Sequence, residues 1–193
     1  MNNTIQYAVD RDGIALLTID LPGKPVNVLM PELMEDLAEL TQRGAADNNV
    51  RGMVLTSAKK SFIAGADIKD MVTAYDRGVS VREAAGFSHD LNRTLRAMET
   101  CGKPIAAAIN GLALGGGLEV CLACHYRVLA SDTGAVLGFP EVNIGLLPGA
   151  GGTQRAPRLI GFRNAATMIL QCRNQRPDQA LEMGLVHELA PAA

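Results

Sequence analysis

One stretch of the sequence, GLALGGGLEVCLACH (residues 111–125), contains two patterns that predict different chemistry. Its end, Cys121-Leu-Ala-Cys124-His125, matches the C-x-x-C-H pattern of covalent haem attachment. Its beginning is the run Gly115-Gly116-Gly117, with Glu119 two positions further on. Glycines at the start of a helix let a ligand approach backbone N–H groups closely. This half therefore predicts an anion or oxyanion site beside a carboxylate.

The haem interpretation is the weaker of the two. The C-x-x-C-H pattern lies within an apolar run, and the N-terminal MNNTIQYAVDRDG lacks the features of an export signal. Buried free cysteines usually act as small apolar side chains, and His125 is expected to be a packed or hydrogen-bonded histidine. A zinc site would need two more ligands. The remaining candidates show no paired spacing: Cys101, Cys172, His89 and His187. We therefore expect no metal.

The glycine run by itself leaves two explanations open. Neither the G-x-x-x-x-G-K-[ST] phosphate loop nor a G-x-G-x-x-G fingerprint is present in the sequence. Close packing of a helix against a strand also requires glycine, so the run is compatible with a purely structural role. Other residues are needed to distinguish a packing role of the glycine run from a role in binding an anion or oxyanion.

Two further features favour chemistry. The segment Phe62-Ile-Ala-Gly-Ala-Asp67 is a second glycine-containing bend at a strand-to-helix junction, and it could offer another N–H. Glu141 stands between Pro140 and the apolar VNIGLLPG. A single loop glutamate usually just accepts a backbone hydrogen bond. Buried carboxylates are costly unless they are paired or functional, so two glutamates in apolar, glycine-rich sequence predict a functional pair, Glu119 and Glu141.

The composition is that of one globular domain without a strong electrostatic field. The chain has 193 residues, 48% of them hydrophobic and 20% charged, and its formal net charge is -2. Trp is absent and aromatic residues make up 4% of the chain, so a nucleic-acid surface is not expected. No apolar run approaches the ~20 residues of a membrane span. We expect a cytoplasmic protein whose four cysteines are free thiols.

The elements that must position these residues follow from periodicity and turn signals. Strands are expected at 4–9 and 13–20, paired as a hairpin, and at 52–57, 105–109, 126–131 and 184–189. Helices are expected at 31–46, 81–100, from the glycine run onward, and at about 153–160, 163–171 and 177–183, with a loop over 139–152. The helix at 81–100 should bury one face made of Phe87, Leu91, Leu95 and Met98. This order predicts an α/β fold with buried strands.

Three motifs resemble those of the crotonase (enoyl-CoA hydratase/isomerase) superfamily, in the same order and with similar spacing. They are FIAGADIKDM, INGLALGGGLEV and GFPEVNIGLLPGAGGTQR. The resemblance covers residues 1–193 and is greatest to the N-terminal hydratase/isomerase portion of bacterial multifunctional fatty-acid oxidation α-subunits. It implies a spiral of repeated ββα units. Members usually continue into further helices, so a crotonase-like core lacking the C-terminal helical region is expected, either truncated or part of a longer chain.

The resemblance also implies a site. The substrate would be an acyl-CoA thioester whose carbonyl oxygen binds the N–H groups of Ala66 and Gly116. Glu119 and Glu141 match the family's two catalytic glutamates. The implied substrate- and CoA-binding residues are Ala64, Gly65, Ala66, Asp67, Ile68, Lys69, Gly115 and Gly116. Coenzyme A belongs to the substrate, so no separate cofactor is expected. Lys59 and Lys60 are either contacts of the CoA phosphates or part of a solvated surface.

The implied activity is hydration of the C2=C3 bond of 2-enoyl-CoA in fatty-acid β-oxidation, with Δ3-Δ2-enoyl-CoA isomerase activity at the same site. The alternatives are a hydrolase or dehalogenase of the same fold, which would usually replace one glutamate, and an acyl-CoA-binding module without turnover. In a multifunctional parent, a 3-hydroxyacyl-CoA dehydrogenase part would follow and a thiolase subunit would be a partner. Residues 72–90 could form a wall of the acyl pocket, but they do not indicate acyl chain length.

Overall fold

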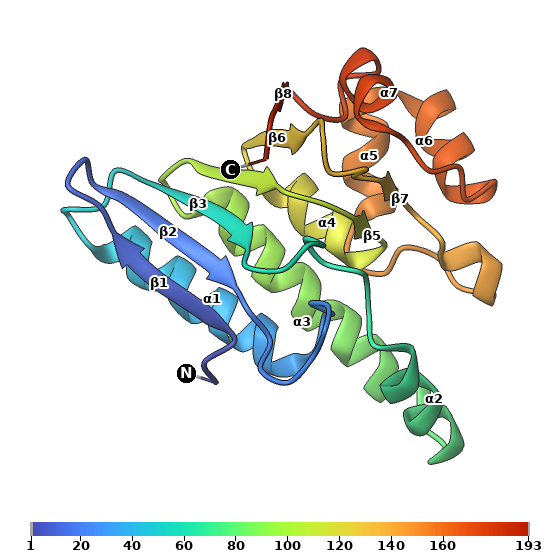
Figure 1. Cartoon of the computed structure of the whole chain (residues 1–193). Helices are drawn as coiled ribbons and strands as arrows, with labels where there is room; N and C mark the ends of the chain where they lie inside the picture. The colour runs from blue at the N-terminus through green and yellow to red at the C-terminus, as the bar shows by residue number, and fades with distance from the viewer. Residues whose placement is uncertain (1, 193) are drawn as a thin grey trace.

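The computed structural model describes residues 2–192 and contains two sheets (Figure 1). The large sheet has the order β1-β2-β3-β4-β6-β8, in which β1 is antiparallel to β2 and the other neighbours are parallel. Its strands are β1 (Ile5–Val9), β2 (Ile14–Ile19), β3 (Gly52–Ser57), β4 (Ile105–Ile109), β6 (Tyr126–Ala130) and β8 (Glu188–Ala190). A small parallel sheet pairs β5 (Ala113–Leu114) with β7 (Leu137–Gly138).

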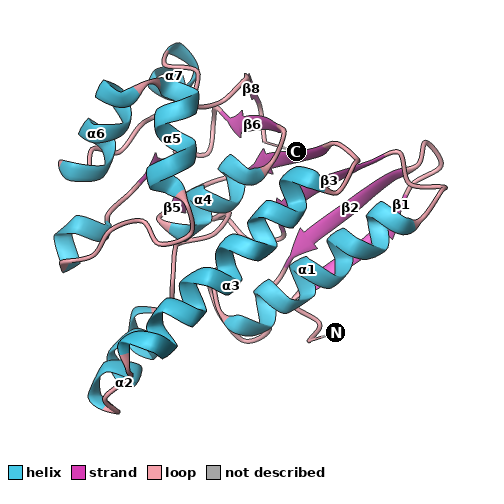
Figure 2. Ribbon diagram, turned by 180° about the vertical axis from the view of Figure 1, so that it is seen from behind, coloured by secondary structure: helices cyan, strands magenta, loops and turns pink. Residues whose placement is uncertain are grey.

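Helices cover one face of the large sheet and surround the small one. Their bounds are α1 (Pro31–Ala46), α2 (Ile68–Asp76), α3 (Val81–Thr100), α4 (Gly116–Ala123), α5 (Gly152–Ile160), α6 (Phe162–Leu170) and α7 (Pro177–Glu182), with a 3-10 turn η1 (Glu141–Ile144). Figure 2 shows α1 and α3 side by side across the sheet, while α2 projects from the body of the molecule. None of the residues of α2 is buried, whereas α4 is buried from Gly117 to Ala123.

The chain repeats one unit: a strand of the large sheet, a short extended segment, and a helix. The units β4-β5-α4 and β6-β7-α5 are complete. In the two preceding units the short segment is reduced to isolated bridges, Leu29 with Ala66 and Ile63 with Ala113. Because the strands of the large sheet run parallel from β2 onward, each short segment lies beside its counterpart in the next unit. The ββα spiral that the resemblance implied is therefore present.

Most of the predicted elements are confirmed. The hairpin forms, and the helices at 31–46 and 81–100 and the strands at 52–57 and 105–109 have the expected bounds. The strand predicted at 184–189 is wrong over most of its length, since only Glu188–Ala190 is extended there. Gly184 takes a positive φ of 77° and Leu185 N donates to Ala180 O at 2.8 Å, so these residues close α7 instead of pairing in the sheet.

The apolar face predicted for α3 is confirmed in part. Leu91, Leu95 and Met98 are buried, but Phe87 is 46% exposed. The reason is geometric, because the N-terminal half of α3 extends beyond the sheet toward α2 and has no layer beneath it (Figure 2). A capping box at Ser80 and Glu83 supports this half instead: Glu83 N donates to Ser80 Oγ, and Ser80 N donates to Glu83 Oε2.

A buried asparagine ties the units together. Asn27 is fully buried; its Nδ2 donates to Ile19 O, Ser57 Oγ and Phe62 O, and its Oδ1 accepts from Leu21 N at 3.0 Å. These partners lie at the ends of β2 and β3 and at the start of the bend that follows β3. One side chain thus fixes the point where two successive units leave the large sheet.

Replacing Asn27 by Ala should destabilise the fold. The change leaves buried backbone groups without partners, and we expect a fall of about 3 kcal/mol in the free energy of unfolding. Urea unfolding followed by circular dichroism measures it. Asn49→Ala, at an exposed position, is the matched control and should stay within about 0.5 kcal/mol of wild type. Equal midpoints for the two variants would contradict the role assigned to Asn27.

Candidate active site

Glu119 is a buried carboxylate held by two backbone amides. It lies in the first turn of α4 and is 2% exposed. Its Oε1 accepts hydrogen bonds from Ala150 N at 2.8 Å and from Gly152 N at 2.6 Å. Residue 152 has to be glycine, because a Cβ there would lie 3.0 Å from the same oxygen and 2.8 Å from the ring of Phe139. The loop before α5 therefore fixes where this carboxylate points.

Glu141, the first residue of η1, brings a second carboxylate to the same place. A Cβ on Gly115 would lie 2.6 Å from Glu141 Oε1, and a Cβ on Gly116 would lie 3.8 Å from Glu119 Oε2. The two carboxylates thus reach adjacent glycines at the start of α4. Glu141 Oε2 is a buried oxygen with no hydrogen-bond partner in the structure. An unpartnered buried acceptor beside a second carboxylate is typical of a site that receives a ligand or a water.

The surroundings raise the pKa of both carboxyl groups. Burial raises the pKa of Glu119 to about 7, and the charge of Glu141 adds to this, while the hydrogen bonds from Gly152 and Ala150 and the charge of Arg155 lower it. Burial also raises the pKa of Glu141. A close pair of carboxyl groups whose pKa values are raised favours a state in which one is protonated and one ionised near neutral pH.

The bend after β3 lies beside this pair. Leu29 N donates to Gly65 O at 2.7 Å, and Leu29 forms a bridge with Ala66. The side chain of Leu29 also contacts the other side of the site, because a Cβ on Gly116 would lie 2.3 Å from its Cδ1. Ala66 and Gly116 therefore flank the same leucine, and neither is buried. The structure brings together the two residues predicted to supply N–H groups.

The N–H of Gly116 occupies a favourable position for an oxyanion. Gly116 is the first residue of α4, so no carbonyl of the helix is available to its N–H, and the positive end of the helix dipole lies there. The next residue packs tightly, since a Cβ on Gly117 would lie 2.3 Å from Ile63 O. The glycine run thus serves both explanations left open by the sequence: it allows close packing, and it exposes an amide.

The segment predicted to line the CoA side is held by contacts with residues 24–29 and by the cap of α2. Asp67 caps α2 by accepting from Lys69 N, and its other oxygen pairs with Lys24 Nζ at 2.6 Å. Ala64 N donates to Asn27 O. Ile68 and Lys69 are exposed. Contact of residues 64–69 with CoA stays a prediction.

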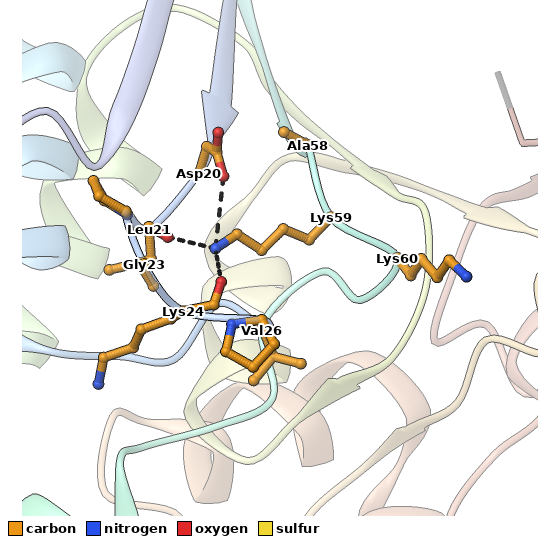
Figure 3. Close-up of a pocket in the computed structure, with 10 residues that line it drawn as sticks. Asp20, Leu21, Gly23, Lys24, Val26, Ala58, Lys59 and Lys60 are labelled. Atoms are coloured by element: carbon orange, nitrogen blue, oxygen red, sulfur yellow. Dashed lines mark hydrogen bonds and ion pairs between the residues drawn. The ribbon is translucent and has the colours of Figure 1, made fainter.

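A cavity of about 660 Å³ lies between the turn at 20–26 and residues 58–60 (Figure 3). Lys59 has turned its ammonium group inward, where it donates to the carbonyl oxygens of Leu21 and Lys24 and lies 3.6 Å from an oxygen of Asp20. Its side chain is 12% exposed. These contacts favour a structural role for Lys59 over a contact with CoA phosphates. Lys60 points away from the cavity (Figure 3).

The segment Cys121-Leu-Ala-Cys124-His125 has a structural role. Cys121 and Cys124 are buried, and burial raises the pKa of both thiols, that of Cys124 to about 12. His125 Nδ1 accepts from Ile105 N at 3.1 Å, as expected for a hydrogen-bonded histidine. All four cysteines are free, and residues 2–192 contain no group of three or more His, Cys, Asp and Glu side chains that could hold a metal ion.

Two groups that shape the site were not anticipated from the sequence. The amides of Ala150 and Gly152 hold Glu119, and the only signal for them is the glycine-rich PGAGG before a helix. Asn27 supports the bend that carries Ala66, but a single asparagine in a turn-rich segment gives no indication that it will be buried. Arg155 forms an ion pair with Glu99, with its Nε 2.6 Å from Glu99 Oε1.

The solved structures similar to this chain have the same fold. An enoyl-CoA hydratase from Bacillus anthracis matches 98% of this chain and 70% of its own with a TM-score of 0.88 and 33% identity. DspI from Pseudomonas aeruginosa matches 99% of this chain and 70% of its own with a TM-score of 0.88 and 30% identity. The fold is thus that of a crotonase-type protein.

The family described as enoyl-CoA hydratase/isomerase matches residues 10–193, and the chain belongs to it. A curated relative is the fatty acid oxidation complex subunit alpha of Shewanella oneidensis, which is 44% identical over 192 residues. The match covers 99% of this chain and 27% of that relative, so the chain spans about a quarter of the length of the curated relatives it matches. The family supports an enzyme of the crotonase type. Within residues 2–192, no helix has the length and apolarity needed to cross a membrane.

The pKa of Glu119 predicts that the stability difference between wild type and Glu119→Gln depends on pH. A glutamate in the unfolded chain ionises near 4.5, whereas folded Glu119 does so at about 7. Between these pH values the folded state holds the extra proton, so stability falls as the pH rises. Glu119→Gln removes this penalty. The variant should therefore gain up to about 3 kcal/mol relative to wild type as the pH rises from about 4.5 to above 7.

The measurement is urea unfolding of both proteins at several pH values across this window. Glu182→Gln, at an exposed position on α7, is the control and should follow the wild-type curve. A constant difference between Glu119→Gln and wild type at all pH values would show that Glu119 ionises normally in the folded protein.

Proposed function

We propose that the site hydrates 2-enoyl-CoA thioesters. The observation that carries the proposal is the meeting of two carboxylates, Glu119 and Glu141, with the amide-bearing starts of two helical segments, at Gly116 and Ala66. The family and its fatty-acid oxidation relatives support the same reaction class. Both glutamates are present, which favours hydration over the hydrolase alternative.

The amides would act on the thioester oxygen. Addition at C3 places negative charge on this oxygen in an enolate-like transition state. The N–H groups of Ala66 and Gly116 would stabilise this charge by hydrogen bonding to the oxygen. Loss of one such donor typically costs about 10²–10³ in rate.

The carboxyl groups of Glu119 and Glu141 would transfer the protons. The ionised member of the pair takes a proton from water as the water oxygen bonds to C3, and the protonated member gives its proton to C2. One proton is taken and one is given, so the pair keeps its total charge, and only the location of the proton changes. A pKa of about 7 for Glu119 makes both protonation states accessible near neutral pH.

The same geometry would support isomerisation of a Δ3-enoyl thioester. One carboxylate removes a proton from C2, the enolate oxygen binds the two amides, and the proton returns at C4. This reaction needs no water. A single carboxylate within reach of C2 and C4 is sufficient for it, so the hydratase and isomerase activities would depend differently on the two glutamates.

The longer relatives suggest the context of this site. The Shewanella oneidensis relative is named as a subunit of a fatty acid oxidation complex. We propose that this chain acts in a multifunctional parent that carries a 3-hydroxyacyl-CoA dehydrogenase part and associates with a thiolase subunit. The dehydrogenase part would oxidise the 3-hydroxyacyl thioester that hydration produces, and the thiolase subunit would cleave the resulting 3-ketoacyl thioester.

Crotonyl-CoA hydration tests the proposal. Wild-type protein should remove the ultraviolet absorbance of the conjugated thioester, and Glu119→Gln and Glu141→Gln should each slow this by about 10²-fold or more, because each removes one partner in proton transfer. The exposed variant Glu182→Gln should hydrate at the wild-type rate. Glutamine variants within a few-fold of wild type would contradict the assignment. Saturable acyl-CoA binding without hydration by wild type would instead favour a binding module.

A further inference from the structure

The loop that holds Glu119 is itself held by α3. Gly149 O accepts hydrogen bonds from Ser88 Oγ at 2.6 Å and from Asn92 Nδ2 at 2.8 Å. This carbonyl belongs to the same peptide unit as Ala150 N, which donates to Glu119. A trans peptide is planar, with its C=O and N–H pointing in opposite directions. Fixing the oxygen from one side therefore aims the N–H at the carboxylate on the other.

Arg155 holds the next carbonyl of the same loop. Its Nη1 donates to Ala150 O at 2.7 Å, and its Nε and Nη2 donate to the two carboxylate oxygens of Glu99 at 2.6 and 3.2 Å. The side chains of Arg155 and Glu99 are 14% and 24% exposed. A paired, planar guanidinium in such a partly buried site has a well-defined geometry. Arg155 thus connects α5, the loop and α3.

We propose that Ser88, Asn92, Glu99 and Arg155 form a clamp that positions Glu119 for the reaction by fixing the loop amides that bind it. This inference rests on the proposed hydratase function for its kinetic consequences, although not for its geometry. The four residues are positioning residues, since they act through Gly149 and Ala150. They lie outside the sequence motifs that predict the catalytic pair, except for Arg155 in GGTQR.

The clamp also sets the charge around Glu119. The charged groups that face the network are Glu141 from η1, Arg155 from α5, and Glu99 from α3 together with its second partner, Arg96, at 3.2 Å. Among these, Arg155 lowers the pKa of Glu119 and Glu141 raises it. Removing the guanidinium while Glu99 remains should therefore raise the pKa of Glu119.

Arg155→Met and Arg155→Lys separate the two effects. Methionine removes the charge and the hydrogen bonds, so kcat should fall by roughly 10- to 10²-fold with KM within about 3-fold, because misplacing a catalytic group affects the chemical step. The limb of the pH–rate profile that reports Glu119 should also move to higher pH. Lysine keeps the positive charge but lacks the paired N–H donors of the guanidinium. The limb of the pH–rate profile that reports Glu119 should therefore stay in place, while kcat still falls.

Arg158→Met is the matched control, since Arg158 lies one turn further along α5 and is exposed. It should leave kcat, KM and the pH profile at wild-type values. Ser88→Ala is the mild second variant, because it removes one hydrogen bond to Gly149 O and leaves that of Asn92 in place. It should lower kcat without moving the pH limb, and urea unfolding shows that each variant is folded.

A readout without turnover keeps the inference separate from the proposed function. NMR titration of ¹³C-labelled glutamate carboxyl groups, with the Glu119 signal assigned by Glu119→Gln, measures its pKa directly. A higher pKa in Arg155→Met than in wild type and Arg158→Met supports the clamp, even if wild type hydrates nothing and the proposed function fails. A changed unfolding free energy with an unchanged Glu119 titration and wild-type kcat would overturn it, because the four residues would then only stabilise the fold.

Discussion

The close approach of α4 to the short-segment layer is the constraint on which the rest of the site depends. At Gly117, a Cβ would lie 2.3 Å from the carbonyl oxygen of Ile63, and at Gly116 it would lie 2.3 Å from the side chain of Leu29. Any side chain at these positions would push the helix away from the bend that carries Ala66. Because the helix starts this close, its first amide and its first-turn carboxylate, Glu119, lie within reach of groups supplied by the neighbouring units.

The spiral explains why residues far apart in the sequence meet there. Ala66 ends the short segment of one unit, Gly116 and Glu141 follow the short segments of the next two, and successive units stack in parallel. The junctions, where the short segment of each unit passes into its helix, are therefore aligned by the pairing of the backbone strands alone. In the proposed reaction the chemistry is distributed over three junctions: one would supply an amide, one an amide with a carboxylate, and one a second carboxylate. Variation at a single junction could change the reaction while leaving the fold intact.

The sequence predicted what depends on local pattern. Helical spacing in α1 and α3 predicted both helices with their observed bounds. Apolar, glycine-rich surroundings predicted that Glu119 and Glu141 act as a pair, and the structure places both side chains against adjacent glycines at the start of α4. What it could not predict depends on distant contacts. Phe87 has the spacing of a core residue, yet it is 46% exposed, because the N-terminal half of α3 extends beyond the sheet (Figure 2). The two residues each of β5 and β7 carry no periodic signal, and they are strands only because their neighbours align them.

The environment of Glu119 combines opposing influences on its pKa, of which burial is the largest. Burial and the charge of Glu141 favour the protonated form, while two amide hydrogen bonds and the charge of Arg155 favour the ionised form. A carboxyl group buried without the amides would stay protonated, and one exposed beside Arg155 would stay ionised; neither could exchange a proton readily near neutral pH. The residues that hold the amides in place thus help to determine whether Glu119 can act as an acid or a base. In the proposed mechanism, that role extends the functional site beyond the two glutamates to α3, which contacts the reacting groups only through a single loop.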